Sequence, residues 1–189
     1  ALHCLVLYRT NLLAGTDEGF FEIRDNTALP VSKTGGFWIF QPLQNLHQSS
    51  MVVACNYHGV RIFENAGHNF IDRGAIENFV ESARFLVIDN NNTIWVSHPY
   101  RGIYKIQAGI TGAYEIKLYA SANGLPSSLN NHVYKVKNRV VIATEKGIYE
   151  YNMRTDAFEP SHFFKDIFGS LGVRYLKEDP GGNIWFIQE

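Results

Sequence analysis

Short apolar runs separated by polar turns follow one template along the whole chain. Each run reads as a strand, stops close to a glycine, and resumes with apolar or aromatic residues. The central residues of the five runs recur every 40 to 46 positions, and they are Leu13, Val53, Trp95, Val141 and Trp185. Self-similarity of about 40 to 50 residues built from strands is typical of propeller blades, each of four antiparallel strands. We therefore predict an all-β chain of about four and a half blades of an incomplete or larger β-propeller.

The best preserved unit shows how local chemistry makes each strand. Residues 133–136 and 139–144 are rich in β-branched and aromatic side chains and predict the first two strands, joined by a tight turn. Gly147 turns the chain again, because glycine tolerates positive φ, and 148–151 alternates as a third strand. A weaker outer strand begins at 157–159. No helical periodicity is sustained through the unit, so the pattern excludes a helical fold.

The period divides the chain into successive blades. The predicted boundaries are approximately 1–36, 37–80, 81–125 and 126–170, with a partial blade over 171–189. Half a blade would leave an apolar sheet face and an unpaired strand edge exposed. We therefore expect further blades, from a longer repeat chain or an assembly, to complete the ring.

One connection departs from the strand pattern. Within residues 74–84, the spacing of Ile76, Phe79, Val80 and Ala83 favours one side of a short helix. This is the single helix that the pattern predicts.

Charge and composition exclude two kinds of partner. The chain has 17 basic and 18 acidic residues and a formal net charge of −1, so we predict no basic surface that would attract nucleic acid. It has no long apolar run and no charged segment followed by an apolar stretch at its N-terminus, so we expect neither membrane insertion nor a targeting peptide. Cys4 and Cys55 lie in apolar runs and are expected to be buried thiols rather than a disulfide.

Two turns carry a more specific motif. Residues 89–97 and 178–186 both read as an acidic residue, a turn containing Asn or Gly, an apolar residue, Trp, and a further apolar residue. A Gly-Leu-Pro link within 123–128 and a Gly-apolar-aromatic strand start at 147–151 accompany this motif. The pattern resembles the repeats of two-component regulator propellers over essentially the whole chain, although three of the five units replace the Trp by Leu or Val.

The resemblance implies a sensory role. Propellers of that family form the extracytoplasmic sensor region of hybrid two-component histidine kinases in Bacteroidetes, where they respond to breakdown products of polysaccharides. It implies a periplasmic location within a membrane-anchored, homodimeric protein, with an oligosaccharide ligand and further blades of the same protein as partners. The kinase and phosphorelay modules would lie outside these residues, so this segment is expected to hold no catalytic residue and no cofactor.

The tryptophans and acids of the repeat are predicted to be structural. Trp95 and Trp185 occupy one position in apolar strands, so we expect both to pack between blades rather than to stack on a sugar. Trp38 lies outside the repeat position, and its apolar neighbours favour a strand. Asp89 and Asp179 resemble the Asp-box turn of sialidases, in which the acid is structural. No facing pair of carboxylates, as a glycosidase requires, can be identified.

Loops between the second and third strands supply the candidate ligand-binding residues. These loops gather at one end of a propeller, and ligands are commonly bound by loops on a rigid scaffold. The candidates are Asn56, Tyr57, His58, His98, Tyr100 and Arg101. Their rings can stack on a sugar, their polar groups can bond hydroxyls, and Arg101 can pair with a uronate or a sulfate. The alternative for each residue is an ordinary solvated turn.

Two other functions stay open. Propeller lyases similar to streptogramin lyases use a His base with Mg²⁺, and His58, His98 or His132 would then be the base. A purely structural, dimerising blade set would present apolar loops rather than Tyr, His and Arg. No metal site is predicted, because zinc needs three or four matched ligands and the remaining histidines fall at unrelated phases of the repeat: His3, His47, His68, His132 and His162.

Overall fold

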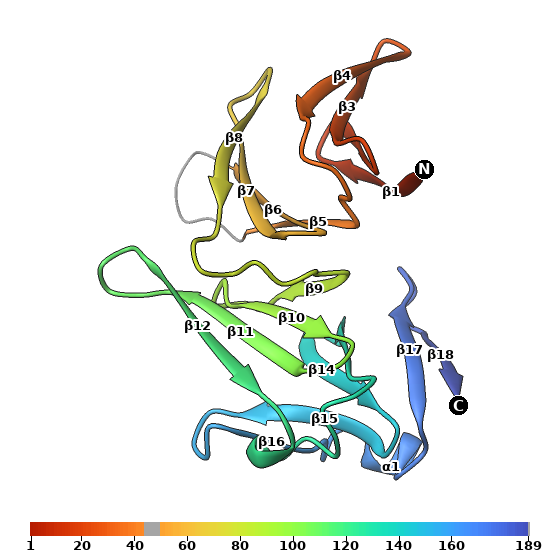
Figure 1. Cartoon of the computed structure of the whole chain (residues 1–189). Coiled ribbons are helices and arrows are strands. Elements are labelled where there is room, and N and C mark those ends of the chain that lie inside the picture. Colours follow the sequence, from red (N-terminus) through yellow and green to blue (C-terminus); the bar gives the residue numbers. More distant parts are fainter. Residues whose placement is uncertain (44–49, 189) are drawn as a thin grey trace. The chain divides into compact units, whose positions relative to one another are not determined.

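The structure is a computed structural model that describes residues 1–43 and 50–188, and these residues form mainly antiparallel sheets (Figure 1). The first sheet contains β1 (Leu2–Tyr8), β2 (Asn11–Thr16), β3 (Phe20–Arg24) and β4 (Thr27–Ser32). The second contains β5 (Ile39–Pro42), β6 (Ser50–Asn56), β7 (Gly59–Asn65) and β8 (Phe70–Ala75). His47, one of the histidines considered above, lies outside the described residues.

The remaining strands continue the same order. The third sheet contains β9 (Phe85–Ile88), β10 (Ile94–His98), β11 (Gly102–Ala108) and β12 (Tyr114–Tyr119). The fourth contains β13 (His132–Val136), β14 (Arg139–Thr144), β15 (Gly147–Asn152) and β16 (Ala157–Pro160), and a two-stranded sheet pairs β17 (Val173–Glu178) with β18 (Ile184–Gln188). Each strand pairs with its neighbours in sequence, so four complete blades and half of a fifth are present, which confirms the predicted fold class.

The chain divides into two compact units, Ala1–Arg84 and Phe85–Glu189. Within the first unit, two blades pack their apolar faces around Phe20. The ring centroid of Phe20 lies 4.5 Å from that of Phe40 and 4.8 Å from that of Phe63, in tilted and edge-on arrangements that aromatic pairs favour. This aromatic core holds the two blades of the first unit together.

The second unit contains two further cores. One lies between the third and fourth sheets and includes Trp95, Tyr119, Ile142 and Phe158. The other joins β14 to β17 and includes the connecting segment that carries the short helix α1 (Lys165–Phe168). Side chains from successive blades therefore interleave, as the unbroken apolar inner strands predict.

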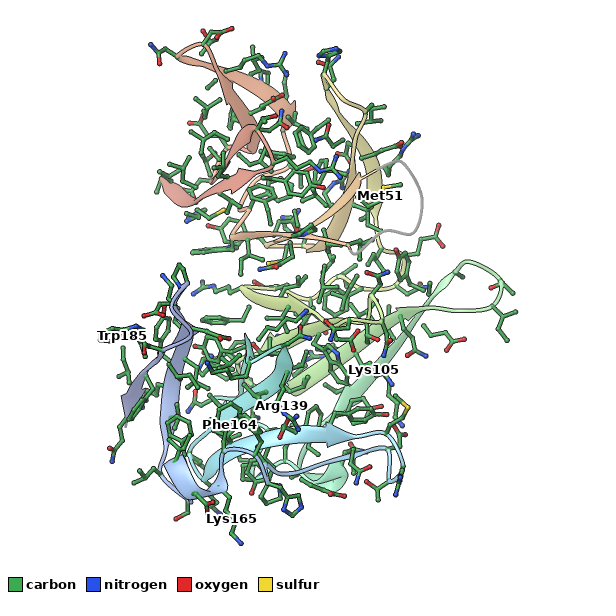
Figure 2. The ribbon with its side chains drawn as sticks, turned by 180° about the vertical axis from the view of Figure 1, so that it is seen from behind. Met51, Lys105, Arg139, Phe164, Lys165 and Trp185 are labelled. Carbon is green, nitrogen blue, oxygen red and sulfur yellow. The ribbon has the colours of Figure 1, made fainter. Side chains whose placement is uncertain are left out.

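All five repeat positions lie on the second strand of a sheet, but the two tryptophans differ in environment. Trp95 is 3% exposed and packs against Tyr151 and Phe158 from the next blade. Trp185 is 61% exposed on β18 (Figure 2). The prediction of blade packing is correct for Trp95. The prediction is wrong for Trp185, because no described strand packs against the face of β18 that carries this side chain.

The short helix predicted within residues 74–84 is wrong. β8 runs to Ala75, and the following described residues form an extended connection with a turn at Glu77 and Asn78. Ile76, Phe79 and Ala83 are buried, which accounts for the apolar spacing, whereas Val80 is exposed. The described helices are instead η1 (Ser121–Asn123) and α1, each too short to give a periodic signal.

Candidate functional site

The turns between the second and third strands share one construction. The last residue of each second strand uses its side chain to accept a hydrogen bond from the backbone N–H two residues later, which is the mechanism of Asx and ST turns. The accepting residues are Thr16 (3.1 Å), Asn56 (2.8 Å), His98 (3.2 Å) and Thr144 (3.1 Å). Two predicted ligand-binding residues, Asn56 and His98, therefore support their own turns, and Asn56 is 1% exposed.

A glycine closes each of these turns from the other side. Gly19, Gly59, Gly102 and Gly147 all have positive φ, between 103° and 156°, and each begins a third strand or directly precedes it. A Cβ atom at any of them would lie 2.1 to 2.4 Å from a carbonyl oxygen at or beyond the end of the fourth strand. Only glycine permits this close approach of two backbones. The loop residues between cap and glycine are thus held on a rigid frame.

In the first unit, Tyr57 lies in a cluster with His3, Asp17, Trp38 and Arg84, which we call the aromatic cluster. The Tyr57 hydroxyl donates to Asp17 Oδ1 at 2.9 Å, and His3 Nε2 lies 2.6 Å from the same oxygen. The His3 ring stacks on Trp38 with centroids 3.9 Å apart, and the Arg84 guanidinium lies 4.7 Å from the Trp38 ring centroid. The cluster combines aromatic surface with a carboxylate and a guanidinium, which suits a ligand rich in hydroxyls.

Hydrogen bonding sets the charge state of the aromatic cluster. Hydrogen bonds that include those from the Tyr57 hydroxyl and His3 hold the pKa of Asp17 well below its usual range. The hydrogen bond to Asp17 in turn raises the pKa of Tyr57. At neutral pH the cluster therefore presents a carboxylate bonded to a phenol that keeps its proton.

In the second unit, the loop with His98, Tyr100 and Arg101 is the more exposed of the two. Tyr100 is 73% exposed, and its backbone N–H donates to His98 Nδ1. The Pro99 carbonyl accepts from the Asn130 N–H at 3.1 Å, which ties the loop to the connection before β13. The six candidates thus form two groups of three, one in each compact unit.

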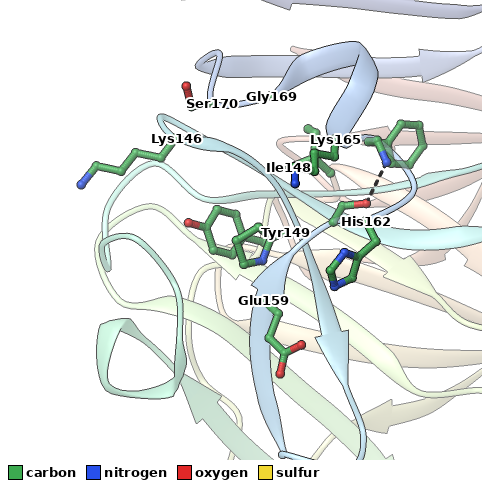
Figure 3. A pocket seen from close by; sticks show the side chains of 11 residues that line it. Lys146, Ile148, Tyr149, Glu159, His162, Lys165, Gly169 and Ser170 are labelled. Atoms are coloured by element: carbon green, nitrogen blue, oxygen red, sulfur yellow. Dashed lines mark hydrogen bonds between the residues drawn. The ribbon is translucent and has the colours of Figure 1, made fainter.

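A pocket lies at the same end of the fourth sheet, beside the turn that contains Lys146. It has a volume of about 730 Å³. Its lining comes from that turn, from β15 and β16, and from the segment that carries α1 (Figure 3).

The histidines considered for a lyase are separated in the structure. His58 lies in the first unit, and His98 and His132 lie in the second. His132 is half-buried, burial lowers its pKa, and its Nδ1 has no hydrogen-bond partner among the described residues. Across residues 1–43 and 50–188, no group of three or more His, Cys, Asp or Glu side chains is arranged to hold a metal ion.

The motif acids act within their turns, as predicted. Asp89 Oδ1 accepts from the N–H groups of Asn91 and Thr93, and Oδ2 accepts from Trp95 Nε1 at 3.0 Å. Asp179 repeats the arrangement, with Trp185 Nε1 at 2.9 Å. The thiols of Cys4 and Cys55 are free; Cys55 is buried, as predicted, whereas Cys4 is half-buried, and burial raises the pKa of both.

Sequence reasoning missed four members of the aromatic cluster, which are His3, Asp17, Trp38 and Arg84. His3, Trp38 and Arg84 lie on three different connections or strands and meet only when the first two blades pack together. Trp38 carried one signal, because it is the one tryptophan outside the repeat position. The pocket beside Lys146 carried no signal in the sequence, because its walls come from a turn, two strands and an irregular segment.

Comparisons with known proteins bear on the fold. No family model matches the chain, and neither does any curated protein. Two crystal structures of the extracellular domain of BT4673 from B. thetaiotaomicron match it throughout. One, described as a proposed one component system, gives a TM-score of 0.71 at 16% identity, and the other, described as a proposed hybrid two component system, gives 0.68 at 17%. Each match covers 100% of this chain and 25% of the other, so the chain spans about a quarter of the structures it matches.

The described part of the chain contains no helix of the length and apolar character needed to cross a membrane.

Proposed function

We propose that this chain is an extracytoplasmic sensor segment of a hybrid two-component signalling protein. The observation that carries the proposal is the match of the whole chain to the extracellular domain of BT4673. The segment would lie in the periplasm as part of a membrane-anchored, homodimeric protein, and further blades would cover its exposed apolar faces. Catalysis would reside in a kinase module outside these residues.

The ligand under this proposal is a polysaccharide-derived oligosaccharide. Tyr57 and Tyr100 are the exposed rings of the two loops, at 37% and 73% exposure, and aromatic faces pack well on the apolar faces of sugar rings. Beside Tyr57, Asp17 would accept hydrogen bonds from hydroxyl groups, and beside Tyr100, Arg101 would bond hydroxyl or acidic groups. Asn56 and His98 would contribute by holding the loops in shape, since both cap their turns.

Signalling would follow from a shift in population. A ligand that binds one arrangement of the blades or protomers more tightly than another stabilises that arrangement. The membrane-anchored module would then read the arrangement. Equal affinity for both would transmit nothing, however tight the binding.

Calorimetric titration of the intact protein with a panel of oligosaccharides tests the proposal. We expect saturable binding that Tyr57→Ala, Tyr100→Ala or Arg101→Ala weakens about tenfold or more, because each change removes a stacking or charge-assisted contact. Tyr57→Phe keeps the ring and removes the hydroxyl that bonds Asp17, so it separates the contribution of the ring to affinity from that of the hydrogen bond. Met153→Ala is the matched control, since Met153 is 73% exposed at the opposite end of its sheet.

Other outcomes would favour the alternatives. Turnover of a small molecule that is lost in a His58, His98 or His132 variant would favour a lyase. Binding of no glycan, with dimerisation that depends on the loop residues, would favour a structural role.

A further inference from the structure

The pocket at the loop end of the fourth sheet has the size of a small-molecule site. Its volume of about 730 Å³ lies within the range of roughly 300 to 1,000 Å³ that is usual for ligand pockets. None of the residues predicted from the sequence to bind a ligand lines it. It therefore represents a second candidate site, at the same end of a blade as the predicted loops.

The walls of the pocket are held in place by buried contacts. Ser161 is 4% exposed, its hydroxyl donates to Glu150 at 2.6 Å, and it accepts from the Phe164 N–H at 3.1 Å, the dashed line in Figure 3. The Gly147 backbone approaches the Gly169 carbonyl so closely that a Cβ would lie 2.4 Å from it. Two sides of the pocket are thereby fixed to each other before any ligand arrives.

The floor of the pocket is apolar and one wall is aromatic. Ile148 and Phe164 are 3% and 1% exposed beneath it. Tyr149 pairs directly with Pro160 across β15 and β16, so their side chains stand next to each other on one face. Rings of this kind pack on the apolar face of a sugar or another cyclic ligand.

The charge of the lining favours an anion. Lys146 and Lys165 both line the pocket, and within the described part of the chain neither forms an ion pair or a side-chain hydrogen bond. Lys146 and His162 lie on opposite sides of Tyr149 in Figure 3. The acidic lining residue is Glu159, whose carboxylate is already bonded by Asn152 and Thr155. The lining therefore carries more positive than negative charge, because it has two unpaired ammonium groups and one carboxylate that already accepts hydrogen bonds.

We propose that this pocket binds a small ligand that carries a carboxylate or a sulfate. The positive charges of Lys146 and Lys165 would attract the charged group, and Tyr149 and Pro160 would hold its ring. Because this inference rests on the proposed sensor function, the ligand is an acidic sugar of one or two residues, either a uronate or a sulfated sugar.

Calorimetric titration of the intact protein with four probes tests the inference. The probes are digalacturonate, glucose 6-sulfate, the neutral disaccharide cellobiose, and succinate as an anion that is not a sugar. We expect one of the two acidic sugars to bind at least about tenfold more tightly than cellobiose, and which one binds identifies the acidic group. Lys146→Gln and Lys165→Gln should each weaken that binding about tenfold, and added salt should weaken it further.

The controls separate this inference from the proposed function. Lys177→Gln, a change at an exposed lysine outside the pocket, should leave affinity unchanged. Both pocket variants should keep the wild-type unfolding temperature, because neither lysine makes an ion pair within the described residues of the folded chain. Acidic sugars that bind no more tightly than cellobiose, or binding that both lysine variants retain, would overturn the inference. If that binding still requires Tyr57 or Tyr100, the sensor function would stand.

Lysine-dependent binding of succinate without binding of any sugar would overturn the acidic sugar as the ligand of this pocket, and it would count against the oligosaccharide ligand of the proposed function. Binding of none of the four probes would overturn the inference. The glycan panel tested against the loop variants would then decide the sensor function by itself.

Discussion

Asp89 and Asp179 occupy the same turn in two different sheets. Each carboxylate accepts backbone N–H groups from its turn and the indole N–H of a tryptophan six residues later. The bonds from Trp185 and Asn183 lower the pKa of Asp179 to about 2. The environments differ, because Trp95 is buried and Trp185 is exposed.

This difference predicts unequal effects of the same substitution. Asp89→Ala leaves the indole N–H of a buried tryptophan and two turn N–H groups without a partner, and we expect a loss of about 3 kcal/mol in the free energy of unfolding. Asp179→Ala is the matched control and should cost much less, because water reaches the groups it leaves unpaired. Chemical denaturation of the two variants measures both values. Equal losses would show that burial of the tryptophan does not set the energy of the turn.

The sequence motif was enough to predict a structural role for both acids. The acid and the tryptophan are close in sequence, so local spacing places them in contact. The aromatic cluster is the opposite case, since His3, Trp38 and Arg84 meet through packing of two blades. Local patterns cannot report such contacts.

At the scale of the strands and turns, four glycines lie in the turns between the second and third strands of the sheets. They explain why each apolar run along the chain stops close to a glycine. At each of these turns, a carbonyl oxygen at or beyond the end of the fourth strand lies so close to the backbone that a side chain would not fit, so the position must be glycine. The strand order and the repeat positions could be predicted because strands of this length leave a clear β pattern. The connection at 74–84 was misread, because buried residues along an extended segment happened to match helical spacing.

Gly102 provides a direct test of this close approach. Its φ is 115°, and a Cβ would lie 2.1 Å from the Tyr119 carbonyl oxygen. We expect Gly102→Ala to destabilise the fold by about 3 kcal/mol, from backbone strain together with the steric clash.

The matched control for Gly102 is Gly112, at the other end of the same sheet. Gly112 has a φ of 83°, and no atom lies within 4 Å of the position that a Cβ would take, so Gly112→Ala reports the strain alone, about 1 kcal/mol. Thermal or urea unfolding compares the two variants. A loss at Gly102 no larger than at Gly112 would argue against the backbone contact.

At the scale of the whole molecule, two apolar surfaces belong to no described core. Leu2, Leu5 and Leu7 are 55% to 71% exposed on β1, and Trp185, Phe186 and Ile187 are 46% to 61% exposed on β18. Large apolar side chains exposed in this number on one strand are commonly covered by a partner. The proposed covering is further blades of the same protein.

These surfaces predict that the 189-residue chain will associate when it is prepared alone. Trp185→Lys should shift it toward the monomer, because a charge at the centre of an apolar contact is costly to bury. Met153→Lys places the same charge at an exposed site away from β18 and should have no effect. Sedimentation velocity over a range of concentrations measures the change. A wild-type chain that stays monomeric would show that these faces do not need a partner.

The paired cap and glycine at each turn have a consequence for how such a chain can diversify. Because the cap and the glycine hold both ends of the loop, the conformation of the turn does not depend on the identity of the two or three residues between them. Tyr57-His58 in one blade and Glu145-Lys146 in another are cassettes of equal length, each set between a capping side chain and a glycine. A library that randomises only these cassettes would sample new specificities while leaving every blade intact.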